Sequence, residues 1–200
     1  MSKAIVYLHG KGGSAGEAAH YQGLFAGYTV LGFAYRAATP WEAQAEFHAY
    51  FDRLQQEYDG VSIIANSIGA CFALYALQET ALEHAYFISP VVQMEQLILR
   101  MLQWAGATEQ ALEALGTIPT AFGETLSWEY LCWVRKHPVT WKTPTYILYG
   151  SEDHLQTREE VERFARETGA DLAVMEGGEH WFHTPEQIAY LDGWLRGRKA

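Results

Sequence analysis

The sequence contains little cysteine and no long apolar segment. Its 200 residues include two cysteines, Cys71 and Cys132, which form neither a C-x-x-C pair nor a Cys/His pattern typical of structural zinc. The chain therefore predicts no disulfide framework and no metal site, and favours a reducing compartment. No apolar run approaches the ~18 residues of a membrane span. The apolar start is interrupted by His9 and Gly10 before a signal peptide could end, so we expect a cytoplasmic protein.

Positive charge is also scarce. The chain has 14 Lys and Arg against 24 Asp and Glu, a formal net charge of −10, which repels a phosphate backbone. Nucleic acid and anionic membranes are therefore not expected as partners. Charged residues make up only 19% of the chain and aromatic residues 14%, unlike a disordered protein. We expect residues 1–200 to fold as a single domain, and no pattern indicates an oligomeric state.

Short apolar runs alternate with segments of helical period. The runs are Ala4–Leu8, Val30–Ala34, Val61–Ala65, Ala85–Ile88, Tyr146–Tyr149 and Leu172–Met175. Strands buried on both faces have this appearance, and their alternation with helices predicts an α/β fold with about six parallel strands. Helix starts are indicated at Thr39, Thr157 and Thr184, each followed three residues later by Glu or Gln as in a capping box. Gly169 lies where the helix after Thr157 is expected to end.

One stretch interrupts this alternation. From Val91 to Lys136 the sequence shows two or three helical patterns with no strand between them. We interpret residues 91–136 as a helical insertion between two strands of the same domain.

Ser67 stands where a buried strand passes into a helical pattern. A nucleophile on such a turn adopts a strained backbone and needs small residues two positions before and after it, and Ala65 and Gly69 meet that requirement. The turn would also place the Ser67 hydroxyl at the positive end of a helix, with the N–H of Ile68 available to a developing oxyanion. The alternative is a serine that only caps the following helix.

A glycine-rich segment, His9–Ser14, follows the first predicted strand. Its glycines allow the backbone to lie close to a ligand at the end of the sheet. A phosphate loop would have the same place, but Lys11 precedes the glycines instead of following them, and the G-x-G-x-x-G spacing is not met. Nucleotide binding is therefore a minor interpretation.

An acid and a histidine follow the last two predicted strands. Asp153 comes after the strand at Tyr146–Tyr149, and His180 comes after the strand at Leu172–Met175. Together with Ser67 they have the chain order Ser, Asp, His of a hydrolytic triad, and all three leave the carboxyl edge of a parallel sheet, where ligands bind.

Neighbouring residues compete for two of these roles. Glu152 is an alternative acid because the register of a turn cannot be read from sequence. His183, just before a helix start, and His154, directly after the acid, are weaker candidates for the base. Cys71 is four residues beyond Ser67 with no charged neighbour, which favours a packing thiol.

These segments together resemble the α/β-hydrolase family over nearly the whole chain. The resemblance rests on His9-Gly10, Ala65–Gly69, Tyr149–Asp153 and Gly178–Trp181. It implies a three-layer fold with a helical lid at residues 91–136. It also implies that Ser67 is the nucleophile, His180 the general base and acid, and Asp153 the residue that orients the imidazole.

The resemblance further implies an oxyanion hole formed by the backbone N–H groups of Lys11 and Ile68. Two features depart from the family pattern. The two strands that usually begin the sheet are missing, which shortens it, and Ala65 stands where Gly is commoner.

The chemistry expected from this set acts on a small-molecule substrate: hydrolysis of a small or medium, uncharged carboxylic ester through an acyl-enzyme intermediate, without a cofactor. Thioester, amide or carbon–carbon bond hydrolysis by the same triad remains an alternative, as does a non-catalytic binding protein on this fold. We expect the substrate pocket to include the following residues: His9, Gly10, Asn66, Met94, Trp128 and Trp181.

Overall fold

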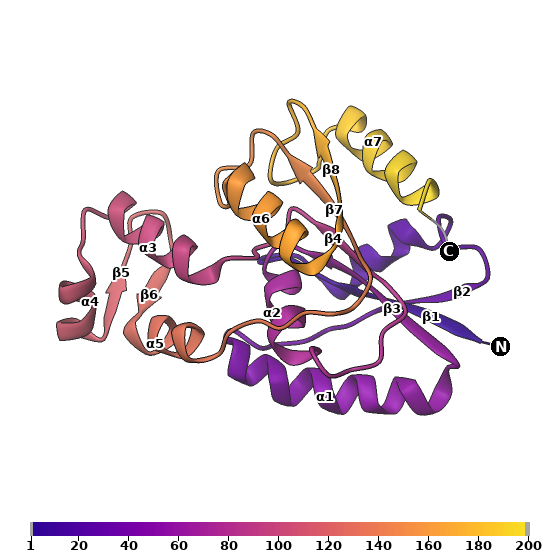
Figure 1. Ribbon diagram of the computed structural model, residues 1–200, viewed down its shortest axis with the longest axis horizontal. Helices are drawn as coiled ribbons and strands as arrows, with labels where there is room; N and C mark the ends of the chain where they lie inside the picture. The colour runs from indigo at the N-terminus through magenta and orange to yellow at the C-terminus, as the bar shows by residue number, and fades with distance from the viewer. Residues whose placement is uncertain (1, 199–200) are drawn as a thin grey trace. The chain divides into compact units, whose positions relative to one another are not determined.

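A six-stranded parallel sheet forms the centre of the computed structural model, which describes residues 2–198 (Figure 1). The strands are β1 (Lys3–Leu8), β2 (Tyr28–Gly32), β3 (Gly60–Asn66), β4 (Ala85–Ile88), β7 (Thr145–Gly150) and β8 (Asp171–Met175). They are ordered β2-β1-β3-β4-β7-β8, and every neighbouring pair is parallel. The expected reduced α/β sheet is confirmed.

The second strand lies earlier than its apolar run predicts. β2 covers Tyr28–Gly32 instead of Val30–Ala34, with Val30 opposite Ile5. The backbone of Ala15 crosses against Gly32, where an added Cβ would lie 2.0 Å from the Ala15 carbonyl oxygen. The N–H of Phe33 still donates to the Tyr7 carbonyl at 3.1 Å, after which the chain leaves the sheet.

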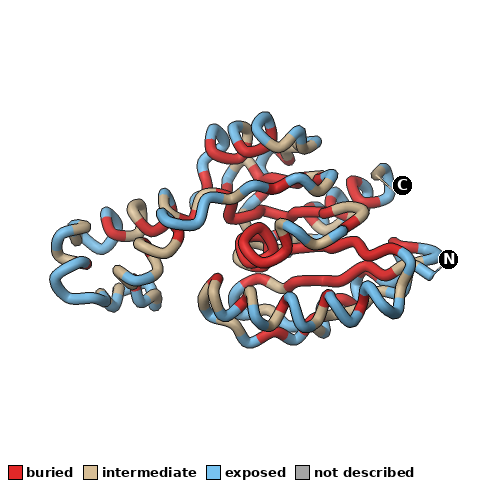
Figure 2. Tube along the Cα trace, turned by 60° about the horizontal axis from the view of Figure 1, so that its bottom comes forward, coloured by how far each residue is buried: buried red, intermediate tan, exposed pale blue. Residues whose placement is uncertain are grey.

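Helices cover both faces of the sheet, because successive side chains of a strand point to opposite faces. Ile5 and Tyr7 belong to a buried cluster with residues of η1 (Ala15–Tyr21) and α7 (Pro185–Arg196). The other helices of this part of the chain are α1 (Pro40–Glu57), α2 (Ile68–Ala76) and α6 (Arg158–Thr168). Helix α2 is buried from Gly69 to Ala76, so the helix that follows the nucleophile candidate is fixed on all sides (Figure 2).

Most of the predicted helix boundaries agree with the structure. The hydroxyls of Thr39 and Thr157 accept the N–H three residues on, and both capping boxes are complete. Gly169 ends α6 in the left-handed conformation, with φ +71°. The box at Thr184 is only half formed, since the Gln187 side chain accepts from the N–H of His183 instead of Thr184.

The chain divides into two compact units. One comprises Met1–Val92 with Thr140–Ala200, and the other comprises Gln93–Val139. The second unit contains α3 (Met94–Trp104), α4 (Glu109–Leu115) and α5 (Trp128–Lys136). It also contains an antiparallel hairpin of β5 (Thr117–Pro119) and β6 (Thr125–Ser127).

The hairpin corrects the expectation of a strand-free insertion, because strands of three residues are too short to show an alternating pattern. Arg135 joins the helices of this unit by donating to Glu95 at 2.7 Å and to Glu109. The role of this segment as a lid stays a prediction.

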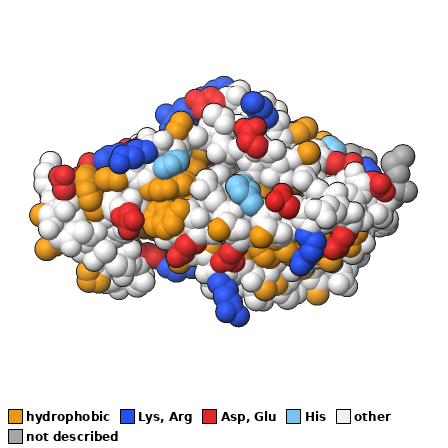
Figure 3. All heavy atoms as spheres, turned by 90° about the horizontal axis from the view of Figure 1, so that it is seen from below, with side chains coloured by type: hydrophobic (Ala, Val, Ile, Leu, Met, Phe, Trp, Pro, Cys, Tyr) orange, Lys and Arg blue, Asp and Glu red, His pale blue; other side chains and the backbone are white. Residues whose placement is uncertain are grey.

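Acidic and basic side chains are interspersed over the face shown in Figure 3. Within residues 2–198, no helix combines the length and the apolar character that crossing a membrane requires.

Candidate active site

Ser67 occupies the turn between β3 and α2 with a left-handed backbone, φ +51° and ψ −116°. Such a conformation costs a non-glycine residue of order 1–3 kcal/mol and persists only where the surroundings impose it. Here the N–H of Ser67 donates to the Ile88 carbonyl at 3.1 Å, and its carbonyl accepts from Ala70 at 3.1 Å and from Val91 at 3.2 Å. The turn is therefore held by the end of the neighbouring strand as well as by its own helix.

Close backbone packing explains the small residues around the turn. A Cβ on Gly69 would lie 2.6 Å from the His9 carbonyl oxygen and 2.7 Å from that of Leu8. Ala65 is fully buried. A Cβ on Gly10 would lie 3.4 Å from the Cβ of Ser67, so the glycine-rich segment after β1 runs directly beside the candidate nucleophile.

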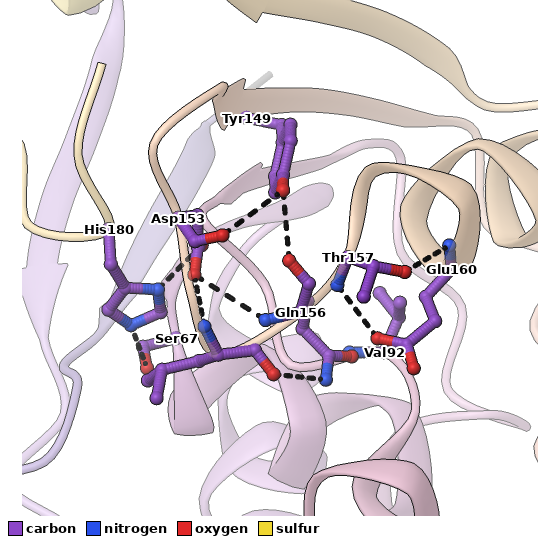
Figure 4. Close-up of polar contacts among 9 residues, drawn as sticks. Ser67, Val92, Tyr149, Asp153, Gln156, Thr157, Glu160 and His180 are labelled. Carbon is purple, nitrogen blue, oxygen red and sulfur yellow. Dashed lines mark hydrogen bonds and ion pairs between the residues drawn. The ribbon is translucent and has the colours of Figure 1, made fainter. Parts of the chain in front are cut away.

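The side chains of Ser67, His180 and Asp153 form one hydrogen-bonded chain (Figure 4). The distance from Ser67 Oγ to His180 Nε2 is 2.8 Å, and that from His180 Nδ1 to Asp153 Oδ2 is 2.6 Å. An ionised carboxylate only accepts, so Nδ1 carries the proton and Nε2 of the neutral ring accepts from the Ser67 hydroxyl. The imidazole is thereby oriented to remove the hydroxyl proton.

The carboxylate of Asp153 is completely buried, whereas the His180 side chain is 23% exposed. Asp153 Oδ1, the carboxylate oxygen that does not contact His180, accepts hydrogen bonds from the N–H of Leu155 at 2.8 Å and from the N–H of Gln156 at 3.5 Å. Buried charge is costly unless hydrogen-bonded, and these bonds supply the compensation. The acid is fixed, and it faces the histidine.

Tyr149 supports this loop from within the sheet. Its hydroxyl donates to the Gln156 carbonyl at 2.9 Å and to the Asp153 carbonyl at 3.4 Å (Figure 4). Burial, reinforced by the Asp153 carboxylate, raises the pKa of Tyr149 to about 12, so the phenol stays protonated and remains a donor.

The competing side chains lie elsewhere. Glu152 is exposed, and its N–H donates to the Gly178 carbonyl at 2.8 Å. His183 Nδ1 is 2.7 Å from the Trp181 carbonyl oxygen, and His154 is exposed. Cys71 is buried, which raises the pKa of its thiol above the ordinary range, as expected of a packing residue.

The two predicted oxyanion donors come from the segments that follow β3 and β1. Ile68 is the first residue of α2, and the first N–H groups of a helix have no partner within it. Lys11 lies in the glycine-rich turn, which is closed by a bond from the Gly13 N–H to the Gly10 carbonyl at 3.1 Å. Their role as oxyanion donors stays a prediction.

A cavity of about 700 Å³ opens beside Ser67 and His180. Three of the predicted pocket residues line it, namely Gly10, Asn66 and Trp181. His9 does not, since its ring stacks on Tyr35 with centroids 4.2 Å apart. Met94 and Trp128 belong to the other compact unit, Gln93–Val139, so their place in the pocket stays a prediction.

Sequence reasoning missed several lining residues: Tyr7, Glu17, His20, Tyr21, Phe182, Ile188 and Leu191. Tyr7, the tyrosine inside the otherwise apolar run Ala4–Leu8, is the sequence feature that could have indicated a lining residue. Among the described residues, no three His, Cys, Asp or Glu side chains gather where a metal ion could be held.

Solved structures with the same architecture include Est1E from Butyrivibrio proteoclasticus, with a TM-score of 0.76 and 13% identity over 98% of this chain and 86% of that chain. The mouse alpha/beta hydrolase domain-containing protein 10 gives a TM-score of 0.72 and 13% identity over 97% and 88%. The chain has the α/β-hydrolase fold. An alpha-beta serine hydrolase homologue from Coxiella burnetii gives a TM-score of 0.62 and 14% identity over 100% and 85%.

The α/β-hydrolase fold was implied by the motifs at His9, Ser67, Asp153 and His180, and that expectation is confirmed. No family model and no curated protein matches the sequence itself.

Proposed function

We propose that this protein is a serine hydrolase that cleaves a small or medium, uncharged carboxylic ester through an acyl-enzyme intermediate. The observation that carries the proposal is the hydrogen-bonded chain from Ser67 through His180 to the buried Asp153. Its three members come from the ends of three strands at one edge of the sheet, beside a cavity. Such a chain is the arrangement that activates a serine hydroxyl, which is otherwise a weak nucleophile.

In the proposed reaction, His180 Nε2 takes the hydroxyl proton while Ser67 Oγ attacks the ester carbonyl carbon. The N–H groups of Lys11 and Ile68 stabilise the negative oxygen of the tetrahedral intermediate. His180 returns the proton to the leaving alcohol, and the acyl group remains on Ser67. Water, deprotonated by the same imidazole, then releases the acid. Asp153 keeps Nδ1 protonated and stabilises the imidazolium in both halves.

The test is covalent labelling of Ser67 with a fluorophosphonate, followed by intact mass measurement. We expect one adduct on the wild type and none on Ser67→Ala, together with loss of p-nitrophenyl ester hydrolysis. Ser151→Ala is a matched control, because Ser151 lies after β7, where its hydroxyl accepts the N–H of Gly177 at 2.8 Å. Labelling that persists in Ser67→Ala contradicts the proposal.

The bond type is tested separately by measuring kcat/KM for ester, thioester and anilide substrates with the same acyl group. We expect the ester to be the best of the three. If the thioester or the anilide is hydrolysed faster than the ester, Ser67 remains the proposed nucleophile, but the proposed substrate class changes to thioesters or amides. An adduct without turnover of any of them would favour a binding protein.

A further inference from the structure

The cavity beside Ser67 contains a second carboxylate besides the proposed machinery. Among its lining residues, all within the described range 2–198, Glu17 is the single acidic side chain. It lies in η1 and is exposed, so its carboxylate is accessible to whatever occupies the cavity.

Protein contacts hold this carboxylate in place. Tyr7 donates its hydroxyl to Glu17 Oε2 at 2.6 Å, and the Ser14 N–H donates to Oε1 at 2.8 Å. Gly13 makes room for it, because a Cβ there would lie 2.7 Å from Oε1. Tyr7 is 1% exposed, and burial raises the pKa of its phenol far above the ordinary range, so it remains a donor. Glu17 is therefore a positioned acceptor.

Tyr7, which holds Glu17, belongs to the strand beside the one that precedes the nucleophile. Tyr7 lies in β1, and its neighbour β3 ends at Asn66, directly before Ser67. Tyr7 lies one residue before the end of β1 and Ser67 one residue after the end of β3, and both line the cavity. A ligand group bound at Glu17 is thus held at a fixed place relative to the serine hydroxyl.

A carboxylate has about four acceptor positions, and the protein occupies two of them. The remaining positions can be satisfied by a donor but not by another anion. We infer that Glu17 determines specificity by accepting a hydrogen bond from a hydroxyl or ammonium group on the far part of the ester. This inference rests on the proposed ester hydrolysis and extends its substrates from uncharged esters to esters with a cationic end group. Trp181 and Phe182 belong to the same lining and give it apolar surface for the hydrocarbon part of such a substrate.

Lys11 and a histidine outside the proposed triad, His20, also line the cavity. His20 Nε2 lies 2.8 Å from Asp192 Oδ1, so this ring nitrogen is already engaged by the protein. Lys11 lies in the glycine-rich turn. If Lys11 instead of Glu17 controlled the charge preference, esters with a terminal carboxylate would be the best substrates, and the test includes them for that reason.

The experiment compares 4-methylumbelliferyl esters whose acyl chains of six, eight or ten atoms end in methyl, hydroxyl, ammonium or carboxylate. A parallel set of butyrate esters has the same end groups on the alcohol, and the hydrolysis of these esters is measured by the release of butyric acid. For wild type we expect kcat/KM for the hydroxyl and ammonium esters to exceed that for the carboxylate ester about tenfold or more in at least one set, as expected for a hydrogen bond to a charged group.

Glu17→Gln keeps the shape of the side chain and removes the charge. We expect it to lower the ratio of ammonium to methyl ester about tenfold and to raise kcat/KM for the carboxylate ester. Glu57→Gln is the control for net charge, because Glu57 is at the end of α1 before β3, at the opposite edge of the sheet from Ser67. We expect its selectivity to equal that of wild type.

The inference is overturned if selectivity is unchanged in Glu17→Gln for both sets, if Glu57→Gln changes it equally, or if the carboxylate esters are the best substrates. Failure of the proposed function has a different result, namely no hydrolysis of any ester and no fluorophosphonate adduct. Hydrolysis of every ester without dependence on Glu17 overturns only the inference about specificity.

Discussion

Two loops at the same edge of the sheet present carboxylates in opposite ways. After β7, Asp153 is completely buried, and backbone N–H groups and His180 take up its oxygens. After β1, Glu17 is exposed to the cavity and keeps acceptor positions unused by the protein. Burial with full hydrogen bonding fixes the orientation of a reacting group, whereas exposure leaves a group able to meet a ligand. In the proposed site, the loop after β7 would therefore hold a reacting group and the loop after β1 would meet the substrate.

The largest loss of activity is expected when the buried carboxylate of Asp153 is removed. Asp153→Asn keeps the size of the side chain but favours the wrong histidine tautomer, so we expect kcat for p-nitrophenyl butyrate to fall about 10⁴-fold. Glu152→Gln is the matched control on the exposed neighbour, and its activity is expected to remain within about twofold of wild type. Equal losses in the two variants would show that the comparison of buried and exposed acids is wrong.

The α/β sheet and the elbow at Ser67 could be predicted from the sequence because they depend on local rules. Buried parallel strands appear as continuous apolar runs, and a strained turn requires small residues beside it, as at Ala65 and Gly69. The choice between Asp153 and Glu152 could not be made in this way, since it depends on the direction in which one turn residue points.

Features that depend on long-range packing were missed. The contact between Tyr7 and Glu17 forms only because η1 folds back over β1. The apolar run Val30–Ala34 predicts a second strand that begins and ends later than β2 does. The close crossing of Ala15 at Gly32, where the strand ends, has no local sequence pattern. The hairpin of β5 and β6 was missed because each of its strands has only three residues.

A second prediction makes the same substitution in each loop. In Gly150→Ala the new Cβ would lie 2.3 Å from the Gly178 carbonyl oxygen, so we expect the free energy of unfolding to fall by about 1–3 kcal/mol. Gly16→Ala, at the start of η1, meets nothing closer than the Ser14 hydroxyl at 3.4 Å and is expected to be neutral or slightly stabilising. Urea unfolding measures both, and equal losses would contradict the difference in backbone packing.

The third prediction concerns the support of the buried loop and has the smallest expected effect. Tyr149→Phe removes the hydroxyl that donates to the Gln156 carbonyl, so we expect the free energy of unfolding to fall by about 1–2 kcal/mol and kcat to fall several-fold. Tyr190→Phe is the control, because the Tyr190 side chain is 41% exposed and its bond to the Val174 carbonyl is long, 3.4 Å. Its stability is expected to change by less than about 0.5 kcal/mol.

The segment Gln93–Val139 is bounded by two glutamine contacts. Gln156 accepts the N–H of Val92 at 2.9 Å, and Gln78 accepts the N–H of Thr140. Both junctions are thereby attached to the unit that contains the triad, one of them to the residue that follows the acid loop. We therefore expect that a segment of different sequence and length can replace residues 93–139 with little backbone shift at Ser67 or Asp153. Val92 and Thr140 are therefore suitable splice points for exchanging the segment between proteins of this fold.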